Sequence, residues 1–282
     1  MRYLLKPLQW IYCIYAFTLF ILFMLPVFLL SLVASLFGHI RGGNMIYRLC
    51  NLWGDVWFFL IGIYHKNIFE TPHDLPAGRH GKNKQYVFVA NHISYLDSPA
   101  LVKAIRQPLR ALGKIEMTKI PVFGFIYSYA AVKVDRSNAE NRAKSMCNLK
   151  SILNKGISII VFPEGTFNMT HHPLKGFYDG AFRVAIETQT PIKPLLFLDT
   201  YDRMNYRSIF SLNPGRSRSV FLNEIPVDGL TTDDIEMLRE KVFGIMEKKL
   251  REYKASWITA PSKEAVSKVR FCHNVTKARR KE

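Results

Sequence analysis

The chain has few cysteines and no obvious set of residues spaced to hold a metal. Its four cysteines, Cys13, Cys50, Cys147 and Cys272, are widely scattered and include no C-x-x-C pair. This spacing argues against a disulfide framework and favours free thiols in a reducing cytosol. The neighbouring His171 and His172 have no cysteine or third spaced ligand near them, so we predict no catalytic metal.

Acidic residues are also scarce. The 282 residues contain 22 Asp and Glu against 39 Lys and Arg, which gives a formal net charge of +17. Such a balance suits an anionic lipid surface, an anionic cosubstrate or a nucleic acid. Because the sequence has no zinc-finger spacing and no aromatic ribonucleoprotein motif, we predict no nucleic-acid partner. Residues 261–282 are interpreted as a basic C-terminal tail.

Charge is missing altogether from one long stretch near the N-terminus. Residues 8–38 contain no Asp, Glu, Lys, Arg or His, and these 31 residues exceed the roughly 20 that a spanning helix needs. Pro26 interrupts the run, so a tilted, kinked span and a re-entrant pair of half-helices both fit. A cleaved signal peptide fits poorly, because the run is too long and no small-x-small site follows it.

An amphipathic helix is predicted after this stretch. Its apolar stripe falls at helical spacing and consists of Ile46, Leu49, Trp53, Val56, Trp57, Leu60 and Ile63. The stripe could lie in a membrane interface, with the tryptophans at headgroup depth, or pack on the following domain. Either arrangement makes residues 1–65 a membrane-associating segment that holds the rest of the chain close to a bilayer.

The alternation of strand and helix patterns over residues 66–260 predicts a single α/β domain. Strands are expected near 86–90, 109–112, 130–134, 157–162, 192–198 and 218–223. Helices are expected near 98–106, 138–154, 180–188 and 235–250. This alternation predicts a mostly parallel central sheet flanked by helices, with the N-terminal helical segment attached at one side.

A histidine and an aspartate follow the first predicted strand of this domain. His92 comes two residues after the strand and Asp97 five residues after His92, so a short turn could bring the two side chains together. A carboxylate that holds one imidazole nitrogen leaves the other free to accept a proton. The alternative is a surface histidine before a helix that Ser98 caps and Pro99 begins.

No nucleophile stands beside the pair. Ser94 and Ser98 are close in sequence, but neither lies in the Gly-x-Ser-x-Gly elbow that projects a catalytic serine. Glu164, Gly165 and Thr166 follow another buried strand, and Asp135-Arg136 follows a third. Because ligands of open α/β sheets bind at the carboxyl edge, these residues and His92 are expected in one crevice.

Taken in order, these segments resemble the glycerolipid acyltransferases, and most closely the 1-acylglycerol-3-phosphate (lysophosphatidate) acyltransferase family. The resemblance covers roughly residues 86–226. It rests on four blocks and a linking segment: Asn91-His92-x4-Asp97, Val132 to Arg136, Phe162 to Thr166, Thr190 to Pro194, and Gly113 to Gly124.

The resemblance implies a membrane-bound enzyme of phospholipid biosynthesis. His92, held by Asp97, would take the proton from the hydroxyl of a lysolipid as that oxygen attacks an acyl thioester. Arg136, Glu164, Gly165, Thr166 and Lys114 would hold the acceptor, with the arginine on its phosphate. The expected partners are a lysophospholipid, acyl-CoA or acyl carrier protein as cosubstrate, and the lipid bilayer; no further cofactor is expected. The oligomeric state stays open.

One residue departs from the family pattern. The position after Gly165-Thr166 is usually arginine in the family, and here it is Phe167. Lys175 or Lys114 could supply charge, but a lysine does not reproduce bidentate binding of a phosphate. Besides phosphatidate synthesis, two alternatives therefore stay open: acylation of another lysolipid, such as an amino-acid-containing one, and a non-catalytic lipid-binding or scaffold protein. The expected location is a bacterial inner membrane, with the catalytic domain on the cytoplasmic side.

Overall fold

The computed structural model describes residues 2–71, 84–134 and 139–259. Its seven strands are β1 (Ile63–Phe69), β2 (Val87–Ala90), β3 (Leu109–Lys114), β4 (Ala131–Val134), β5 (Ser158–Val161), β6 (Ile192–Phe197) and β7 (Gly215–Phe221). Its α-helices are α1 (Arg2–Ser35), α2 (Gly43–Leu60), α3 (Asp97–Ala104), α4 (Phe123–Ala130), α5 (Ala139–Leu153), α6 (Gly180–Glu187), α7 (Thr200–Arg203) and α8 (Ile235–Glu252).

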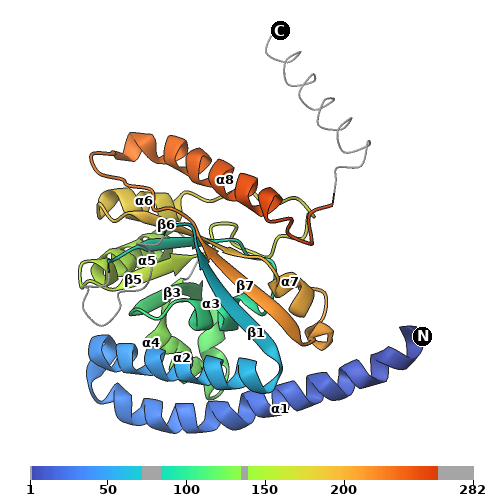
Figure 1. The fold of residues 1–282 in the computed structure, drawn as a ribbon. Coiled ribbons are helices and arrows are strands. Elements are labelled where there is room, and N and C mark those ends of the chain that lie inside the picture. The colour runs from blue at the N-terminus through green and yellow to red at the C-terminus, as the bar shows by residue number, and fades with distance from the viewer. Residues whose placement is uncertain (1, 72–83, 135–138, 260–282) are drawn as a thin grey trace.

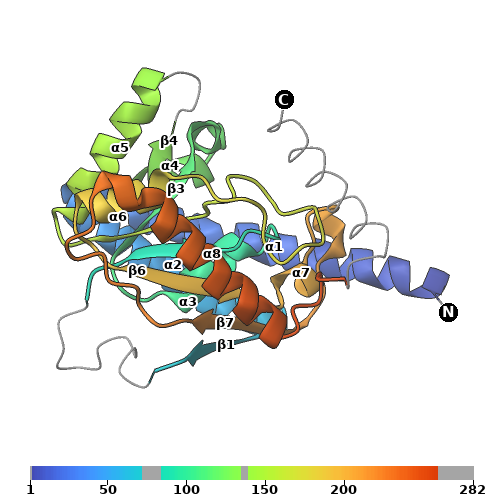
Figure 2. The same ribbon diagram turned by 90° about the horizontal axis from the view of Figure 1, so that it is seen from above.

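The strands form one mixed sheet in the order β1-β7-β6-β2-β5-β3-β4. Strands β2 to β6 are parallel to one another, whereas β7 is antiparallel to β6 and β1 is parallel to β7. Helices cover both faces of this sheet, with α6 and α8 on one face and α1 to α4 on the other (Figures 1 and 2). The predicted fold class, a mostly parallel α/β sheet flanked by helices, is confirmed.

Two hydrophobic cores lie on the two faces of the sheet. Successive side chains of a strand point to opposite faces, so Val87 and Val89 enter one core and Phe88 and Ala90 enter the other. Because both faces are covered, β2 and β5 are buried at every position, which explains why all their residues except Ser158 are apolar. The first core includes residues of α5, α6 and α8; the second includes residues of α1, α2 and α3.

The six predicted strands are present, but the sequence does not predict β1 or α4. β1 is an edge strand that begins at Ile63, the last residue of the stripe expected in the preceding helix. Its residues Ile63 to Phe69 are mostly only half-buried, so they lack the continuous apolar run of a central strand. The predicted final helix is observed as α8, and Thr231 and Asp234 form a capping box just before it.

Helix α1 is one continuous helix that includes both Pro7 and Pro26, so Pro26 does not divide it into two half-helices. Within the described residues, Lys6–Ser35 is the one stretch long and apolar enough to cross a membrane, by length and composition alone. Soluble core helices and signal sequences can meet the same criterion.

The tryptophans of α2 pack inside the protein. Trp57 is fully buried, and its indole N–H donates to the carbonyl of Ala16 in α1 at 2.9 Å. The ring of Phe20 meets Trp53 and Trp57 edge to face, with ring centroids 4.8 and 5.3 Å apart. The two tryptophans are thus covered by α1, and these contacts join α1 to α2 as an antiparallel pair beneath the sheet (Figure 1).

Candidate active site

Three neighbouring parallel strands end at the same edge of the sheet and carry polar residues there. His92 follows β2, Glu164 follows β5, and Thr200 follows β6; β2 lies between the other two strands. The expected meeting of the first and third sequence blocks at the carboxyl edge is therefore observed.

The His92 and Asp97 side chains form a direct hydrogen bond. Nδ1 of His92 lies 2.9 Å from Oδ2 of Asp97. Because an ionised carboxylate only accepts hydrogen bonds, Nδ1 carries the hydrogen and Nε2 of the neutral ring is left with its lone pair. The histidine side chain is 21% exposed and the aspartate is fully buried. Among the described residues, none forms a hydrogen bond with Nε2.

Asp97 is held by the backbone of the turn that it closes. Its Oδ2 accepts from the N–H groups of Ile93 and Ser94 at 2.7 and 2.9 Å, and its Oδ1 accepts from the Thr200 hydroxyl at 2.6 Å. A buried carboxylate without such partners would cost several kcal/mol. Because both oxygens accept hydrogen bonds, the carboxylate is held in one orientation. The bond to Nδ1 then fixes the orientation of the His92 ring.

Glu164 connects the His92 turn to the segment after β5. Its Oε1 accepts from the backbone N–H of His92 at 2.8 Å, and its Oε2 accepts from the backbone N–H of Lys175 at 2.8 Å. The side chain is fully buried. Burial raises the pKa of Glu164 to about 8, although the two backbone hydrogen bonds act in the opposite direction. Both carboxyl oxygens thus face the protein backbone.

Aromatic rings enclose the imidazole of His92. Phe162 stacks on it with ring centroids 4.3 Å apart, and Phe167 lies against it at 4.4 Å with a tilt of 56°. Tyr95 meets Phe167 edge to face at 4.9 Å. The residue that departs from the family pattern is therefore in direct contact with the histidine.

The two serines near His92 differ in their surroundings. Ser94 is fully buried; its hydroxyl donates to the carbonyl of Met204 and accepts from the N–H of Leu96. Ser98 is exposed and lies in the first turn of α3, which begins at Asp97 after Leu96 as the capping residue. The alternative interpretation of Ser98 as the helix cap is therefore wrong, because the Asp97 turn already starts the helix one residue earlier.

Gly165 and Thr166 form the turn after β5. Gly165 has a φ of 72°, which favours glycine, and its N–H donates to the carbonyl of Phe162 at 3.0 Å. Thr166 is exposed, and its hydroxyl accepts from Nζ of Lys175 at 3.0 Å. This turn brings a cationic side chain to the same edge of the sheet as His92.

Of the two other predicted residues, the structure describes Lys114 but not Arg136. Lys114 ends β3, which is separated from β2 by β5, so its exposed side chain starts about 10 Å from β2 along the sheet. Arg136 lies outside the described residues, as does Asp135; the strand before them, β4, ends at Val134.

Thr200 and Asn91 complete the site but were not assigned roles from the sequence. Asn91 is buried and exchanges two hydrogen bonds with the backbone of Phe197, at 3.1 and 2.8 Å, which ties the end of β2 to β6. Thr200 comes two residues after the predicted strand 192–198, so this position near a strand end is the signal from which the sequence could have identified it. Its bond to Asp97 joins residues 103 positions apart, which no local pattern reveals.

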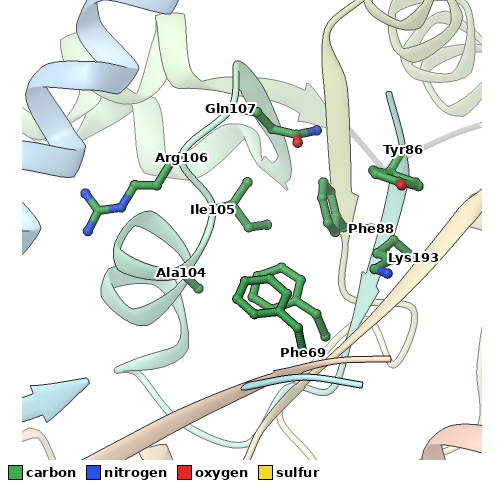
Figure 3. A pocket seen from close by; sticks show the side chains of 9 residues that line it. Phe69, Tyr86, Phe88, Ala104, Ile105, Arg106, Gln107 and Lys193 are labelled. Atoms are coloured by element: carbon green, nitrogen blue, oxygen red, sulfur yellow. The ribbon is translucent and has the colours of Figure 1, made fainter. Parts of the chain in front are cut away.

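The described residues also contain a pocket at the opposite edge of the sheet (Figure 3). Its lining includes Tyr86, just before β2, Lys193, near the start of β6, and Gln107, just before β3. His92 lies at the other end of β2, so this pocket is separate from the His92 site. No group of three or more His, Cys, Asp or Glu side chains in the described chain is placed to hold a metal ion.

Comparison with known proteins gives consistent matches. Residues 67–198 match the model of a family described as Acyltransferase. The chain is 28% identical over 168 residues to the 1-acyl-sn-glycerol-3-phosphate acyltransferase of Haemophilus influenzae, covering 59% of this chain and 68% of that protein. It is 29% identical over 197 residues to a probable 1-acyl-sn-glycerol-3-phosphate acyltransferase of Mycoplasma pneumoniae, covering 64% and 69%.

A solved structure has the same fold. The crystal structure of PlsC, the 1-acyl-sn-glycerophosphate (LPA) acyltransferase from Thermotoga maritima, superposes with a TM-score of 0.70 at 21% sequence identity. The superposition covers 92% of this chain and 100% of that one.

The fold and the matched segment define an α/β enzyme with a histidine and a buried aspartate where the central strands end. Residues 67–198, which contain β2, β5 and β6, match the acyltransferase family. The prediction of an enzyme is confirmed, and so is the resemblance to the glycerolipid acyltransferases. This similarity to a family of enzymes argues against the alternative that the protein is a non-catalytic scaffold.

Glu164 predicts a specific dependence of stability on pH. Below about pH 4.5 the acid is protonated in both the folded and the unfolded chain, so it contributes no pH dependence. Between about 4.5 and about 8 the unfolded chain ionises while the folded chain keeps the proton, so the free energy of unfolding falls as pH rises. Urea titrations in detergent across this range should show that fall, and Glu164→Gln should remove part of it. An unchanged pH slope in a folded Glu164→Gln variant would contradict the assignment.

Proposed function

We propose that the protein transfers a fatty acyl chain from an acyl thioester to the free hydroxyl of 1-acylglycerol-3-phosphate and so forms phosphatidate. The names of the two curated relatives support this acceptor. The observation that carries the proposal is the His92 ring, whose Nδ1 is held by a buried aspartate while Nε2 is left to accept a proton.

In the proposed reaction His92 acts as a general base. Nε2 removes the proton from the acceptor hydroxyl as that oxygen attacks the thioester carbonyl. The new ester bond forms, the carbon–sulfur bond breaks, and the departing sulfur takes the proton from the imidazolium. Asp97 stabilises that imidazolium and keeps the ring in the required tautomer. Ser94 is buried and hydrogen-bonded, which supports direct transfer without an acyl-enzyme.

The negative charge on the thioester oxygen needs donors in the transition state. The sequence offers two sets, backbone N–H groups around Gly165 and those at the start of the helix that contains Ser98. The Gly165 N–H already donates to the carbonyl of Phe162. In the first turn of α3, the Asp97 and Ala100 N–H groups donate to the carbonyls of Ser94 and Leu96, and Pro99 has no N–H. The proposal therefore favours the Ser98 N–H.

Positive side chains at the carboxyl edge would hold the anionic acceptor. Lys175 is placed there by its bond to Thr166, and Lys114 ends β3 at the same edge. Arg136 is proposed as a further phosphate contact because its position matches the family's second block. Glu164 and Gly165 would act through the backbone: Glu164 fixes the N–H groups of His92 and Lys175, and Gly165 permits the turn.

The proposed location is a membrane, with α1 lying along its surface. One side of α1 is buried against the protein from Cys13 to Ala34. The other side exposes large apolar residues over the same length, including Ile14, Leu25 and Val33. A helix that packs on its own domain along its length can place its open side in lipid without leaving that domain. Acyl-CoA or acyl carrier protein as donor would put the catalytic domain on the cytoplasmic side of a bacterial inner membrane.

The position of Phe167 favours a second candidate acceptor. An apolar ring contacts His92 at the position where the family usually has arginine, so the site lacks that guanidinium for a phosphate monoester. A lysolipid with another headgroup, such as an amino-acid lipid, would not need it. The reaction on the hydroxyl would be the same.

We expect His92→Ala to reduce kcat by about 10²- to 10⁴-fold, because a positioned general base contributes about that much. The assay follows thiol release from an acyl thioester and formation of diacyl product with purified protein, lysophosphatidate and detergent. His172→Ala, at an exposed histidine after the β5 turn, is the matched control and should retain full activity. Wild-type transfer by a folded His92→Ala variant would show that another group is the base.

The acceptor is tested with Phe167→Arg. A new charged hydrogen bond should lower the KM for lysophosphatidate by about tenfold, since such bonds contribute about 1.5–3 kcal/mol. The KM for an acceptor with a zwitterionic headgroup should not fall. Phe167→Leu is the control that removes the ring without adding charge. If wild-type protein transfers faster to an amino-acid lysolipid than to lysophosphatidate, the second candidate replaces the first.

A further inference from the structure

A short turn of the catalytic domain exposes two large apolar side chains next to helix α1. Ile209 and Phe210 lie in the 3-10 turn η4 (Ile209–Ser211) and are 45% and 49% exposed. The Ser208 hydroxyl accepts from the N–H of Phe210 at 3.1 Å, and the Ser211 hydroxyl donates to the Ser208 carbonyl at 2.6 Å. These two hydrogen bonds stabilise the turn, in which both side chains are about half exposed to solvent.

This turn continues the exposed apolar side of α1. The rings of Phe210 and Trp10 have centroids 6.5 Å apart, and Trp10 is itself largely exposed. The Cys13 thiol of α1 donates to the carbonyl of Leu212, one residue beyond the turn, at 3.5 Å. Figure 1 shows the chain between α7 and β7 close to α1. Residues distant in sequence thus form one apolar surface.

A basic side chain borders the same surface. Arg207, two residues before Ile209, is exposed. The exposed Asp202 is the nearest acid along the chain on that side, and the protein as a whole carries a net charge of +17. Apolar side chains next to an exposed arginine, on a protein of high positive charge, match an anionic bilayer, whose surface attracts cations and whose interior accepts apolar side chains.

The turn is also connected to the catalytic residues. Ser94 and Asn205 form an isolated antiparallel β-bridge, and the Asn205 N–H donates to the Ser211 hydroxyl at 2.9 Å. Ser94 in turn donates its N–H to Asp97 and its hydroxyl to the Met204 carbonyl. A contact made by Ile209 and Phe210 is thus linked through residues 204–211 to the turn that carries His92.

We propose that residues 207–211 form a second membrane contact, which inserts Ile209 and Phe210 into an anionic lipid surface beside the catalytic turn. This inference rests on the membrane location in the proposed function. Together with α1 it would fix the height and tilt of the domain, so that the lysolipid hydroxyl reaches His92 without leaving the bilayer.

The test places a bimane fluorophore at single cysteines in the full-length protein. The background has Cys50, Cys147 and Cys272 replaced by serine and keeps only the fully buried Cys13. The labelling sites are Ile209→Cys, Leu25→Cys on α1, and Met237→Cys on α8. Met237 is 49% exposed on the opposite face of the sheet and serves as the matched control. Each labelled protein is reconstituted into phosphatidylglycerol-containing vesicles, and quenching by nitroxide lipids is compared with quenching by iodide in water.

We expect the labels at 209 and 25 to be quenched at least severalfold more by the lipid nitroxide than the label at 237, and to be protected from iodide. Quenching at 25 but not at 209 would overturn the second contact while leaving the membrane location intact. Loss of lipid quenching at both sites would overturn the membrane location itself. Protection from iodide at 209 without lipid quenching would show that protein, not lipid, covers the turn, which also overturns the inference.

Discussion

Asp97 places a carboxylate in the interior of the protein, where a charge is stable only when hydrogen bonds replace its water shell. Four donors meet that need: the His92 ring, two backbone N–H groups and the Thr200 hydroxyl. These donors come from the turn after β2 and from the end of β6. Glu164 adds a link from the turn after β5. The position of His92 is therefore determined by three neighbouring strands together.

The same segments connect the site to the surface proposed to meet the membrane. Ser94 bonds to Asp97 on one side and to residues 204 and 205 on the other, and that chain leads to Ile209 and Phe210. Helix α1 packs against α2 through Trp57 and against the chain at Leu212 through Cys13. A lipid acceptor requires this geometry, because its hydroxyl lies close to the headgroup and its acyl chain stays in the bilayer. The proposed function thus explains why the catalytic turn and the exposed apolar surface are adjacent.

Much of the fold and the central pair could be predicted from the sequence, because those signals are local. Buried strands such as β2 and β5 are almost entirely apolar, and His92 and Asp97 are only five residues apart. The bonds from Thr200 to Asp97 and from Asn91 to Phe197 span more than 100 residues and depend on strand order, which the sequence does not specify. The sequence also does not reveal that Phe167 contacts the imidazole, or that β1 extends the sheet at its edge.

The most direct test of this account is the tautomer of His92. Ring-¹⁵N-labelled protein in detergent, with the His92 signals identified by their absence from His92→Ala, would report which nitrogen carries the hydrogen when the ring is neutral. The account predicts a protonated Nδ1, bonded to Asp97, and an Nε2 with the chemical shift of a bare nitrogen. A protonated Nε2 in the neutral ring would contradict it, because that nitrogen could not then accept a proton from the acceptor hydroxyl.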